Sequence, residues 1–147
     1  MISVTIENTG HFMNAMLKDD TFDRFLCINA FFKTSFQTEI NARSDVSPVY
    51  YKDIRPVAFD LLKGSRLPDY FRIVLTTDRE STDRAVEKAG FEDCPVNSLV
   101  LNVTFQNGTL TLSTGVSYGG FSLDKKIESY WDQSVLHFLE KREVRFA

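Results

Sequence analysis

The sequence predicts an α+β domain in which antiparallel strands form a sheet and helices pack on one side of it. Three observations lead to this prediction. Short stretches with alternating apolar and polar residues are typical of half-buried strands. Between them lie stretches with apolar residues three and four positions apart, as on one face of a helix. Asn107-Gly108, a typical hairpin turn, joins two of the alternating stretches. In chain order the elements read βαββα followed by βαββα.

The chain is predicted to begin with a strand and a helix. Apolar and polar residues alternate over residues 1–7, which indicates a half-buried strand. Residues 8–20 then carry apolar side chains at helical spacing. Asn8 or Thr9 can accept a hydrogen bond from a free amide of the first helical turn, so the helix is predicted to start there.

Two more strands and a second helix complete the first half. The strands are predicted over 25–32 and 35–42, with a two-residue turn at 33–34. The helix is predicted over 52–63 and places Pro56 in its first turn, where the missing amide hydrogen costs nothing. Its apolar stripe consists of Ile54, Val57, Ala58, Leu61 and Leu62.

The second half opens with a strand over 70–76. Thr77 and Glu80 then have the spacing of a capping box, in which each side chain satisfies a free backbone amide of the other residue. A helix is therefore predicted from there to Gly90. This helix has few apolar residues, so we expect it to pack at the edge of the fold.

The strongest local signal is a β-hairpin over 99–114. With a two-residue turn, Phe105 lies opposite Leu110, and the apolar residues of both strands share one face. The last helix is predicted to start at Ser122 or Asp124. We expect the core to include Ile54, Val57, Leu61, Val103, Phe105, Leu112, Trp131, Val135 and Phe138.

Length and composition indicate a single domain over residues 1–147. The formal net charge of -3 gives no overall electrostatic signal for nucleic acid, which makes such a partner unexpected. The start lacks the basic and apolar regions of a secretory signal, and no apolar run approaches the roughly 18 residues of a membrane span. We therefore expect a cytoplasmic protein without a membrane partner, in which Cys27 and Cys94 remain free thiols.

Several segments of the chain resemble those of a family of small, uncharacterised firmicute bacterial proteins. The resemblance rests mainly on residues 54–68 (IRPVAFDLLKGSRLP) and 113–118 (STGVSY), with further likeness at 20–23, 121–125 and 131–132. It covers most of the chain. Because the family has no known activity, the resemblance implies no function and no catalytic residue.

A second resemblance concerns the fold of one domain of the bacterial sliding clamp. Residues 1–17, 52–75 and 108–115 (GTLTLSTG) are similar in element order to such a domain. The resemblance implies a clamp-like fold, and the repeated order βαββα suggests an internal duplication, with Asn29 and Asn102 at matching positions. A clamp needs cations on its inner helices, whereas the predicted helices carry balanced charges and two of them have no counterpart.

Reactive groups are sparse, so we assign no catalytic residue, metal ligand or cofactor. The two histidines lie on predicted helices, unconnected in sequence to Cys94, and no pair of cysteines or histidines has metal-ligand spacing. The glycine-rich loop before the last helix is the one candidate for ligand binding, because backbone amides at a helix start can hold an anion. Its candidate residues are Tyr118, Gly119, Gly120, Lys125 and Lys126.

A surface for protein contact is the remaining candidate. Cations gather around one turn, and an aromatic residue lies beside the apolar stripe of the last helix: Lys63, Arg66, Arg72 and Tyr130. We prefer a non-enzymatic domain that binds an unknown protein partner or itself. The alternatives are a ligand-binding domain or enzyme with its site at the Gly119-Gly120 loop, and a clamp-like nucleic-acid accessory protein.

Overall fold

A computed structural model of the chain describes residues 1–42, 48–64 and 67–147. The predicted α+β class and the chain order βαββα-βαββα are confirmed. The elements are β1 (Ser3–Thr5), α1 (Thr9–Leu17), β2 (Leu26–Lys33), β3 (Gln37–Asn41), α2 (Tyr51–Leu62), β4 (Tyr70–Thr76), α3 (Arg79–Ala89), β5 (Val96–Gln106), β6 (Thr109–Tyr118) and α4 (Lys126–Lys141).

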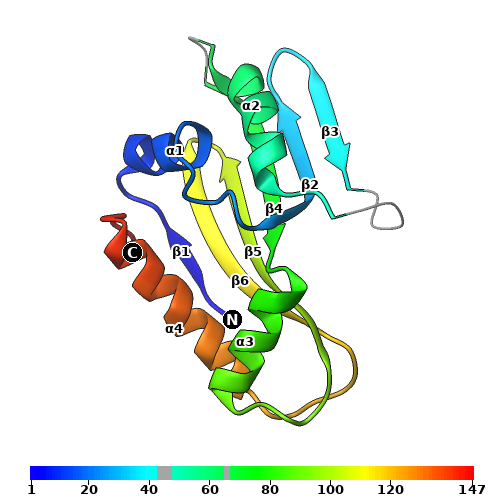
Figure 1. The fold of residues 1–147 in the computed structure, drawn as a ribbon. Helices are drawn as coiled ribbons and strands as arrows, with labels where there is room; N and C mark the ends of the chain where they lie inside the picture. The colour runs from blue at the N-terminus through cyan, green and yellow to red at the C-terminus, as the bar shows by residue number, and fades with distance from the viewer. Residues whose placement is uncertain (43–47, 65–66) are drawn as a thin grey trace.

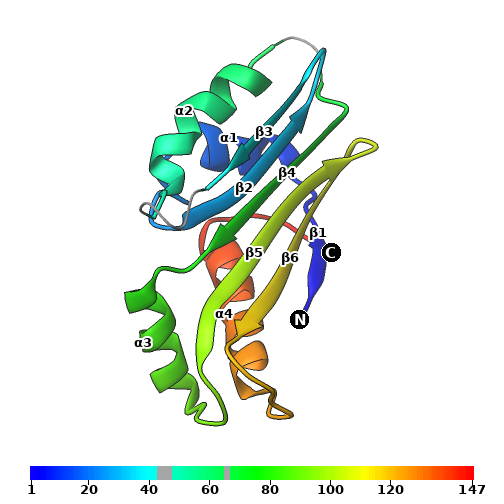
Figure 2. The ribbon, with the colours of Figure 1, turned by 90° about the vertical axis from the view of Figure 1, so that its right-hand side faces the viewer.

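The strands form one antiparallel six-stranded sheet in the order β1-β6-β5-β4-β2-β3. The helices lie on one side of this sheet, as Figures 1 and 2 show. They form two pairs: α1 packs with α2, and α3 packs with α4 against β5 and β6. The molecule therefore has a covered face and an open face, and the two helix pairs divide the covered face.

The chain order repeats, but the sheet order does not. Strand β4 lies between β5 and β2 in the middle of the sheet, whereas β1, its counterpart in the first half, lies at an edge beside β6. The two βαββα halves are thus arranged differently in space. The sheet gives no support to the duplication suggested by the chain order.

The predicted β5–β6 hairpin is confirmed in register and in turn. Phe105 pairs with Leu110, and Gln106 pairs with Thr109 around the two-residue tip. Asn107 and Gly108 have φ angles of 53° and 75°, the left-handed values that this turn requires. The hairpin forms as predicted because its signals are local in sequence.

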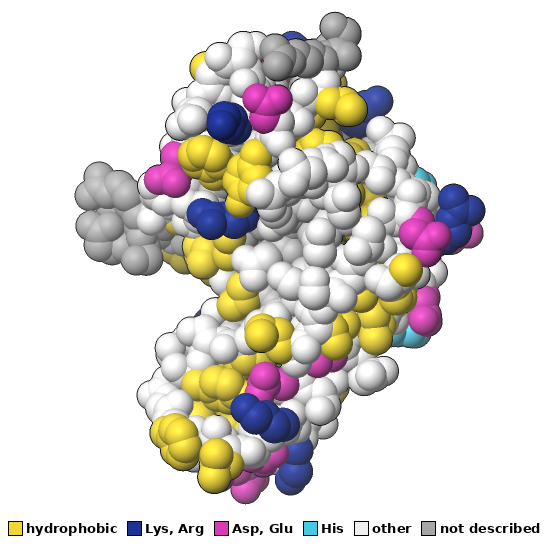
Figure 3. Space-filling view, turned by 180° about the vertical axis from the view of Figure 1, so that it is seen from behind, with side chains coloured by type: hydrophobic (Ala, Val, Ile, Leu, Met, Phe, Trp, Pro, Cys, Tyr) yellow, Lys and Arg dark blue, Asp and Glu magenta, His cyan; other side chains and the backbone are white. Residues whose placement is uncertain are grey.

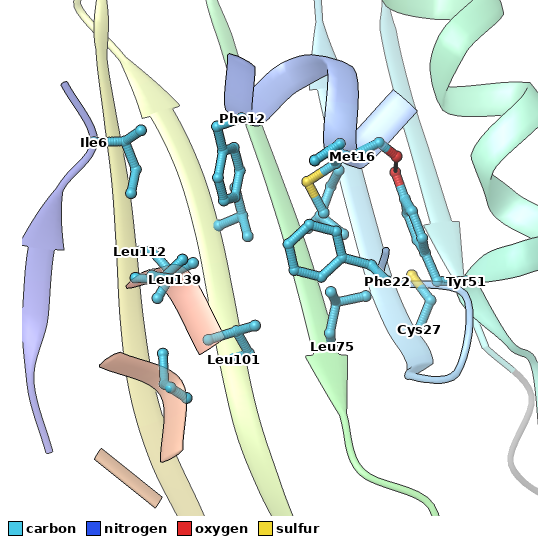
Figure 4. Packing of buried hydrophobic residues seen from close by; sticks show 14 of the residues in the cluster. Ile6, Phe12, Met16, Phe22, Cys27, Tyr51, Leu75, Leu101, Leu112 and Leu139 are labelled. Carbon is cyan, nitrogen blue, oxygen red and sulfur yellow. Dashed lines mark hydrogen bonds between the residues drawn. The ribbon is translucent and has the colours of Figure 1, made fainter. Parts of the chain in front are cut away.

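The core fills the space between the sheet and the helices, and Figure 4 shows part of it. Phe22 lies in this layer, with its ring centroid 5.6 Å from that of Phe12. The buried Tyr51 donates a hydrogen bond from its hydroxyl to the carbonyl of Met16 at 2.9 Å, which joins α2 to α1 without leaving a polar atom unpaired.

Most of the predicted core is confirmed. Ile54, Val103, Phe105, Leu112, Trp131 and Val135 are buried. Leu61 and Phe138 are half-buried and pack against the core. Val57 was predicted to be buried, but 43% of it is exposed. Helix α2 lies near one edge of the sheet and buries Tyr51, Ile54 and Ala58, which is a narrower stripe than the sequence pattern suggests.

The start of α3 differs from the predicted capping box. The capping residue is Asp78, whose Oδ1 accepts a hydrogen bond from the Ser81 amide at 2.8 Å. The Thr77 hydroxyl instead accepts one from the Leu99 amide at 3.0 Å. A contact with β5 therefore occupies the group that local sequence assigned to the cap.

Asn8 holds the capping position of α1, but its side chain caps no amide of that helix. It donates to the Glu143 carbonyl at 2.9 Å and accepts from the Arg145 amide at 2.7 Å. The side chain thus ties the first helix to the C-terminal segment, and the predicted cap at Asn8 or Thr9 is replaced by this tertiary contact.

Three other boundaries are corrected. Helix α2 begins at Tyr51, so Pro56 lies inside the helix and beyond its first turn. Lys33 pairs with Gln37, and the β2–β3 connection is therefore the three residues 34–36. Helix α4 begins at Lys126, two residues after the later of the two predicted starts, which leaves residues 119–125 as a loop.

The open face of the sheet is rich in uncharged polar side chains. Figure 3 views this face, where charged side chains are sparse across the middle of the sheet. Strand pairing sets short polar side chains side by side, in the rows Ser3, Ser113, Asn102 and Thr5, Thr111, Thr104. Such a face is compatible with solvent on one side of an antiparallel sheet.

Candidate functional site

The candidate contact site is residues 119–124 of the loop that connects β6 to α4, at the lower end of the molecule in Figures 1 and 2; we call this segment the 119–124 loop. Its first residues pack tightly on the chain that enters β5. The Gly119 amide donates to the Pro95 carbonyl at 2.7 Å. A Cβ atom at Gly119 would lie 3.1 Å from both Cβ and the carbonyl oxygen of Pro95, so only glycine fits without displacement.

The second part of the loop is held by side chains. The Ser122 hydroxyl donates to Asp93 Oδ2 at 2.7 Å and accepts from the Asp124 amide at 3.1 Å. Asp124 Oδ1 in turn accepts from the amide of Lys126, the first residue of α4, at 2.9 Å. The loop is thus fixed at both ends, on the β5 side and on the α4 side.

These contacts leave two large apolar side chains in solvent. Phe121 is 84% exposed and Leu123 is 79% exposed, on either side of the anchored Ser122. Ordinarily a flexible connection would fold such side chains onto the core, because burial removes apolar surface from water. Here the backbone is hydrogen-bonded in place, and the two side chains remain outside. Figure 3 shows hydrophobic side chains gathered at this end of the molecule.

Tyr118 and Lys125 flank the loop and meet at one carboxylate. The Tyr118 hydroxyl donates to Glu128 Oε2 at 2.9 Å, and Lys125 Nζ lies 3.1 Å from the same oxygen. Desolvation, reinforced by the neighbouring Glu128, raises the pKa of Tyr118 to about 12. Desolvation also acts to raise the pKa of Glu128, but hydrogen bonds from Lys125 and Tyr118 lower it below its usual range.

Four of the five residues predicted to bind a ligand thus have structural partners. Pro95 fills the space beside Gly119, and Gly120 lies against Cys94. Tyr118 and Lys125 share Glu128, while Lys126 is exposed on the first turn of α4. The cavities described below are lined by other residues. Sequence reasoning found this loop, but it missed Phe121 and Leu123, whose exposure depends on the fold.

Of the residues predicted to form a contact surface, the three that the structure describes lie on separate elements. Lys63 lies at the end of α2 and pairs with Asp60 at 3.2 Å. Arg72 lies on the open face of the sheet, where it donates to Asn29 Oδ1 at 3.2 Å. Tyr130 is half-buried on α4, and Arg66 lies outside the described residues.

An open groove separates the two helix pairs on the covered face. Two adjoining hollows of about 740 and 460 Å³ share Asp20, Arg24 and Ser81. Charged side chains of both signs line it, and hydrogen bonding from Ser81 to Asp78 lowers the pKa of that carboxyl. The lining comes from elements far apart in sequence, so no local motif could have predicted this groove.

A smaller, apolar cavity of about 160 Å³ lies between α1, α2 and the ends of β4 and β5 that carry Phe71 and Phe105. We call it the α1–α2 cavity. It is lined almost entirely by apolar side chains: Thr9, Met13, Leu17, Leu62, Leu67, Pro68, Phe71 and Phe105. Its wall includes the stacked rings of Phe71 and Phe105, whose centroids are 5.6 Å apart.

The thiols and imidazoles are held in separate surroundings. Cys27 is buried in the core, and desolvation raises the pKa of its thiol to about 11. Cys94 lies under the 119–124 loop, where its Sγ is 3.8 Å from the Gly120 carbonyl. His11 is hydrogen-bonded to the carbonyl of Arg142, beside the C-terminal end of α4. Within the described ranges, no three His, Cys, Asp or Glu side chains gather as metal ligands.

Comparison with known proteins places the chain in one family. None of its helices in the described ranges has the length and apolar character to cross a membrane. No curated protein and no solved structure matches the chain significantly. A family model does match residues 15–147, which is nearly the whole sequence, and the protein therefore belongs to a family of unknown function, DUF5721.

Proposed function

We propose that this protein is a non-enzymatic protein-interaction domain whose contact surface is the 119–124 loop. The observation that carries the proposal is the exposure of Phe121 and Leu123 on a loop fixed by hydrogen bonds. When a partner covers large apolar side chains, their removal from water lowers the free energy of the complex relative to the separate proteins. Phenylalanine is enriched in the fully buried core of protein interfaces relative to the rest of the protein surface.

The fixed backbone of the loop favours binding for a second reason. Association costs free energy when a loop must first be ordered, and a loop that is already ordered avoids that cost. Gly119, Ser122 and Asp124 supply this order through their contacts with Pro95, Asp93 and the start of α4. The loop thus combines apolar area with a preset geometry.

A clamp-like role on nucleic acid is the weaker candidate. Binding to a phosphate backbone needs an excess of cations on one surface. The groove between the helix pairs mixes acidic with basic side chains, and the open face is mostly uncharged, with Arg72 engaged by Asn29. Our proposal therefore assigns the protein a protein partner in the bacterial cytoplasm, the setting implied by its resemblance to firmicute proteins.

Removing the two apolar side chains tests the proposal. The double variant Phe121→Ser, Leu123→Ser is compared with Phe36→Ser, which removes an exposed phenylalanine (56%) from the β2–β3 connection. Each tagged protein is crosslinked chemically in cells that contain it naturally, and its crosslinked partners are identified by mass spectrometry.

We expect the double variant to lose a defined set of partners that the Phe36→Ser variant retains. Both variants should keep the unfolding midpoint of the unmodified protein, because the substituted side chains are largely outside the core. A set of partners that is unchanged in the double variant would overturn the proposal.

A further inference from the structure

We infer that the groove between the two helix pairs binds a free aromatic α-amino acid. The site is the smaller of its two hollows, of about 460 Å³, which we call the Arg24–Arg142 hollow after two residues of its lining. That lining comes from the α1–β2 connection, the start of α3, and α4 with its C-terminal end, between the helix pairs seen in Figure 1. The inference goes beyond the proposed function, because the hollow and the 119–124 loop share no residue.

Two phenylalanine rings belong to the wall of the hollow. Phe25 and Phe138 are half-buried there, one from the α1–β2 connection and the other from α4. The buried Phe22 packs against both, with its ring centroid 6.1 Å from that of Phe25 and 5.7 Å from that of Phe138. An aromatic ligand that enters the hollow therefore gains ring contacts besides the burial of its own apolar surface.

The hollow is large enough for a ring together with polar groups. An apolar cavity of about 150 Å³ can take up a benzene ring, and small-molecule sites usually have volumes of about 300–1,000 Å³. A hollow of about 460 Å³ thus accommodates the ring of an aromatic amino acid and leaves room for its charged groups. Such sites combine apolar walls with a few polar groups that fix the orientation of the ligand.

The charged residues of the lining are two arginines and one aspartate: Arg24, Arg142 and Asp20. Within the described ranges, no ion pair or side-chain hydrogen bond engages any of these three side chains. Asp23, the neighbour of Arg24 in sequence, is instead bound by Arg55 at 2.9 Å. The hollow therefore offers cations and a carboxylate that the described part of the chain leaves without an opposite charge.

This set of charges favours a zwitterion over a simple ion. A guanidinium group binds a carboxylate through two parallel N–H donors, which suits Arg24 and Arg142. An anion without a positive group would also meet the Asp20 carboxylate, and a cation without a negative group would meet the two arginines. A ligand that carries both a carboxylate and an ammonium group gives each of the three side chains an opposite charge.

The charges also lie beside the aromatic wall. The Arg142 guanidinium carbon is 5.4 Å from the ring centroid of Phe138, and Arg24 directly precedes Phe25 in the chain. In an aromatic α-amino acid, the ammonium and carboxylate groups share one carbon atom, which a single methylene separates from the ring. The ligand thus has an apolar group and two opposite charges at the same close spacing as the hollow.

Isothermal titration calorimetry of the purified full chain tests the inference. L-Phenylalanine is compared with L-alanine, which lacks the ring, with 3-phenylpropanoate, which lacks the ammonium group, and with 2-phenylethylamine, which lacks the carboxylate. The site variants are Asp20→Asn, Arg24→Gln and Arg142→Gln. Asp19→Asn and Arg145→Gln are matched controls, because both residues are exposed and lie outside the lining of the hollow.

We expect saturable binding of one L-phenylalanine per chain and weaker binding of the other three compounds. Loss of one charged group from the ligand should weaken binding by about three- to tenfold. The matching variant should remove that difference: Asp20→Asn should no longer distinguish L-phenylalanine from 3-phenylpropanoate. Arg24→Gln and Arg142→Gln should each distinguish it less well from 2-phenylethylamine, and the two controls should bind as the unmodified protein does.

The three substituted residues are exposed, so the site variants should keep the unfolding midpoint of the unmodified protein. No saturable binding of L-phenylalanine up to its solubility limit would overturn the inference. Tighter binding of 3-phenylpropanoate than of L-phenylalanine would also overturn it, as would equal losses in the site variants and the controls. None of these results bears on the 119–124 loop, whose test in cells uses other residues.

Discussion

Trp131 joins α4 to the sheet by burial and by one hydrogen bond. Its indole Nε1 donates to the Val100 carbonyl at 2.9 Å, and its ring is buried in the core. Replacing it by Ala should lower the free energy of unfolding by about 3–5 kcal/mol, measured by urea denaturation. Val57→Ala is the control and should change it by less than about 0.5 kcal/mol, the usual range for surface positions. Equal losses in the two variants would contradict the assigned core.

Tyr118 gives the folded protein a stability that is lost at high pH. Its pKa lies near 10 in the unfolded chain and at about 12 in the fold, where desolvation and Glu128 disfavour the ionised form. Between these pH values the folded state keeps a proton that the unfolded state has released, so stability is complete below about pH 10 and falls above it. Tyr118→Phe should weaken this fall, as measured by urea denaturation from pH 9 to about 12. An unchanged profile would mean that the fold does not perturb Tyr118.

Single residues illustrate what local pattern can and cannot predict. Ile54 and Val57 belong to the same apolar stripe of α2, yet the first is buried and the second exposed. The stripe predicts a face, whereas the width of the covered part depends on how far the helix lies from the edge of the sheet. Phe121 is the opposite case, since nothing in its neighbours along the chain predicts that its side chain stays in water.

At the scale of elements, the cap of α3 offers a direct test. Asp78 accepts a hydrogen bond from the Ser81 amide, which lowers the pKa of the carboxyl. Asp78→Ala should cost about 1 kcal/mol of unfolding free energy at neutral pH. Because the folded pKa is depressed, this contribution is present above the unfolded pKa near 3.8 and disappears as pH falls through the folded value.

Thr77→Ala supplies the comparison for that cap. The Thr77 hydroxyl accepts a hydrogen bond from the Leu99 amide of β5, and no carboxylate takes part in this contact. The unfolding free energy lost in Thr77→Ala should therefore not depend on pH in the acid range. If the Asp78→Ala and Thr77→Ala losses varied with acid pH in the same way, the cap would be wrongly assigned.

Elements were predictable where their signals are local, and their ends were not. The β5–β6 hairpin follows from strand alternation and Asn107-Gly108, all within one short segment. The caps differ from the prediction because distant partners take the capping side chains: Leu99 takes the Thr77 hydroxyl, and the C-terminal segment takes Asn8.

At the scale of the whole molecule, sequence could predict the class and the chain order but not the order of strands in the sheet. That order places β4 between two hairpins and β1 at an edge, which local pattern does not encode. The α1–α2 cavity depends on the same arrangement, since its lining comes from two helices, two strands and a connection. The sequence could single out the glycine-rich loop as a candidate site. The exposure of its apolar side chains could be seen only in the folded structure.

The most direct test of the claim that the 119–124 loop is a contact surface is site-specific photocrosslinking. A photoreactive amino acid is introduced at Phe121 in one variant and at Phe36, also exposed but at another end of the sheet, in a second. Each variant is irradiated in living cells, and crosslinked species are separated by mass and identified. A discrete adduct at position 121, absent at position 36, is the predicted result. No adduct at position 121, or the same diffuse products at both positions, would contradict the claim that this loop binds a protein.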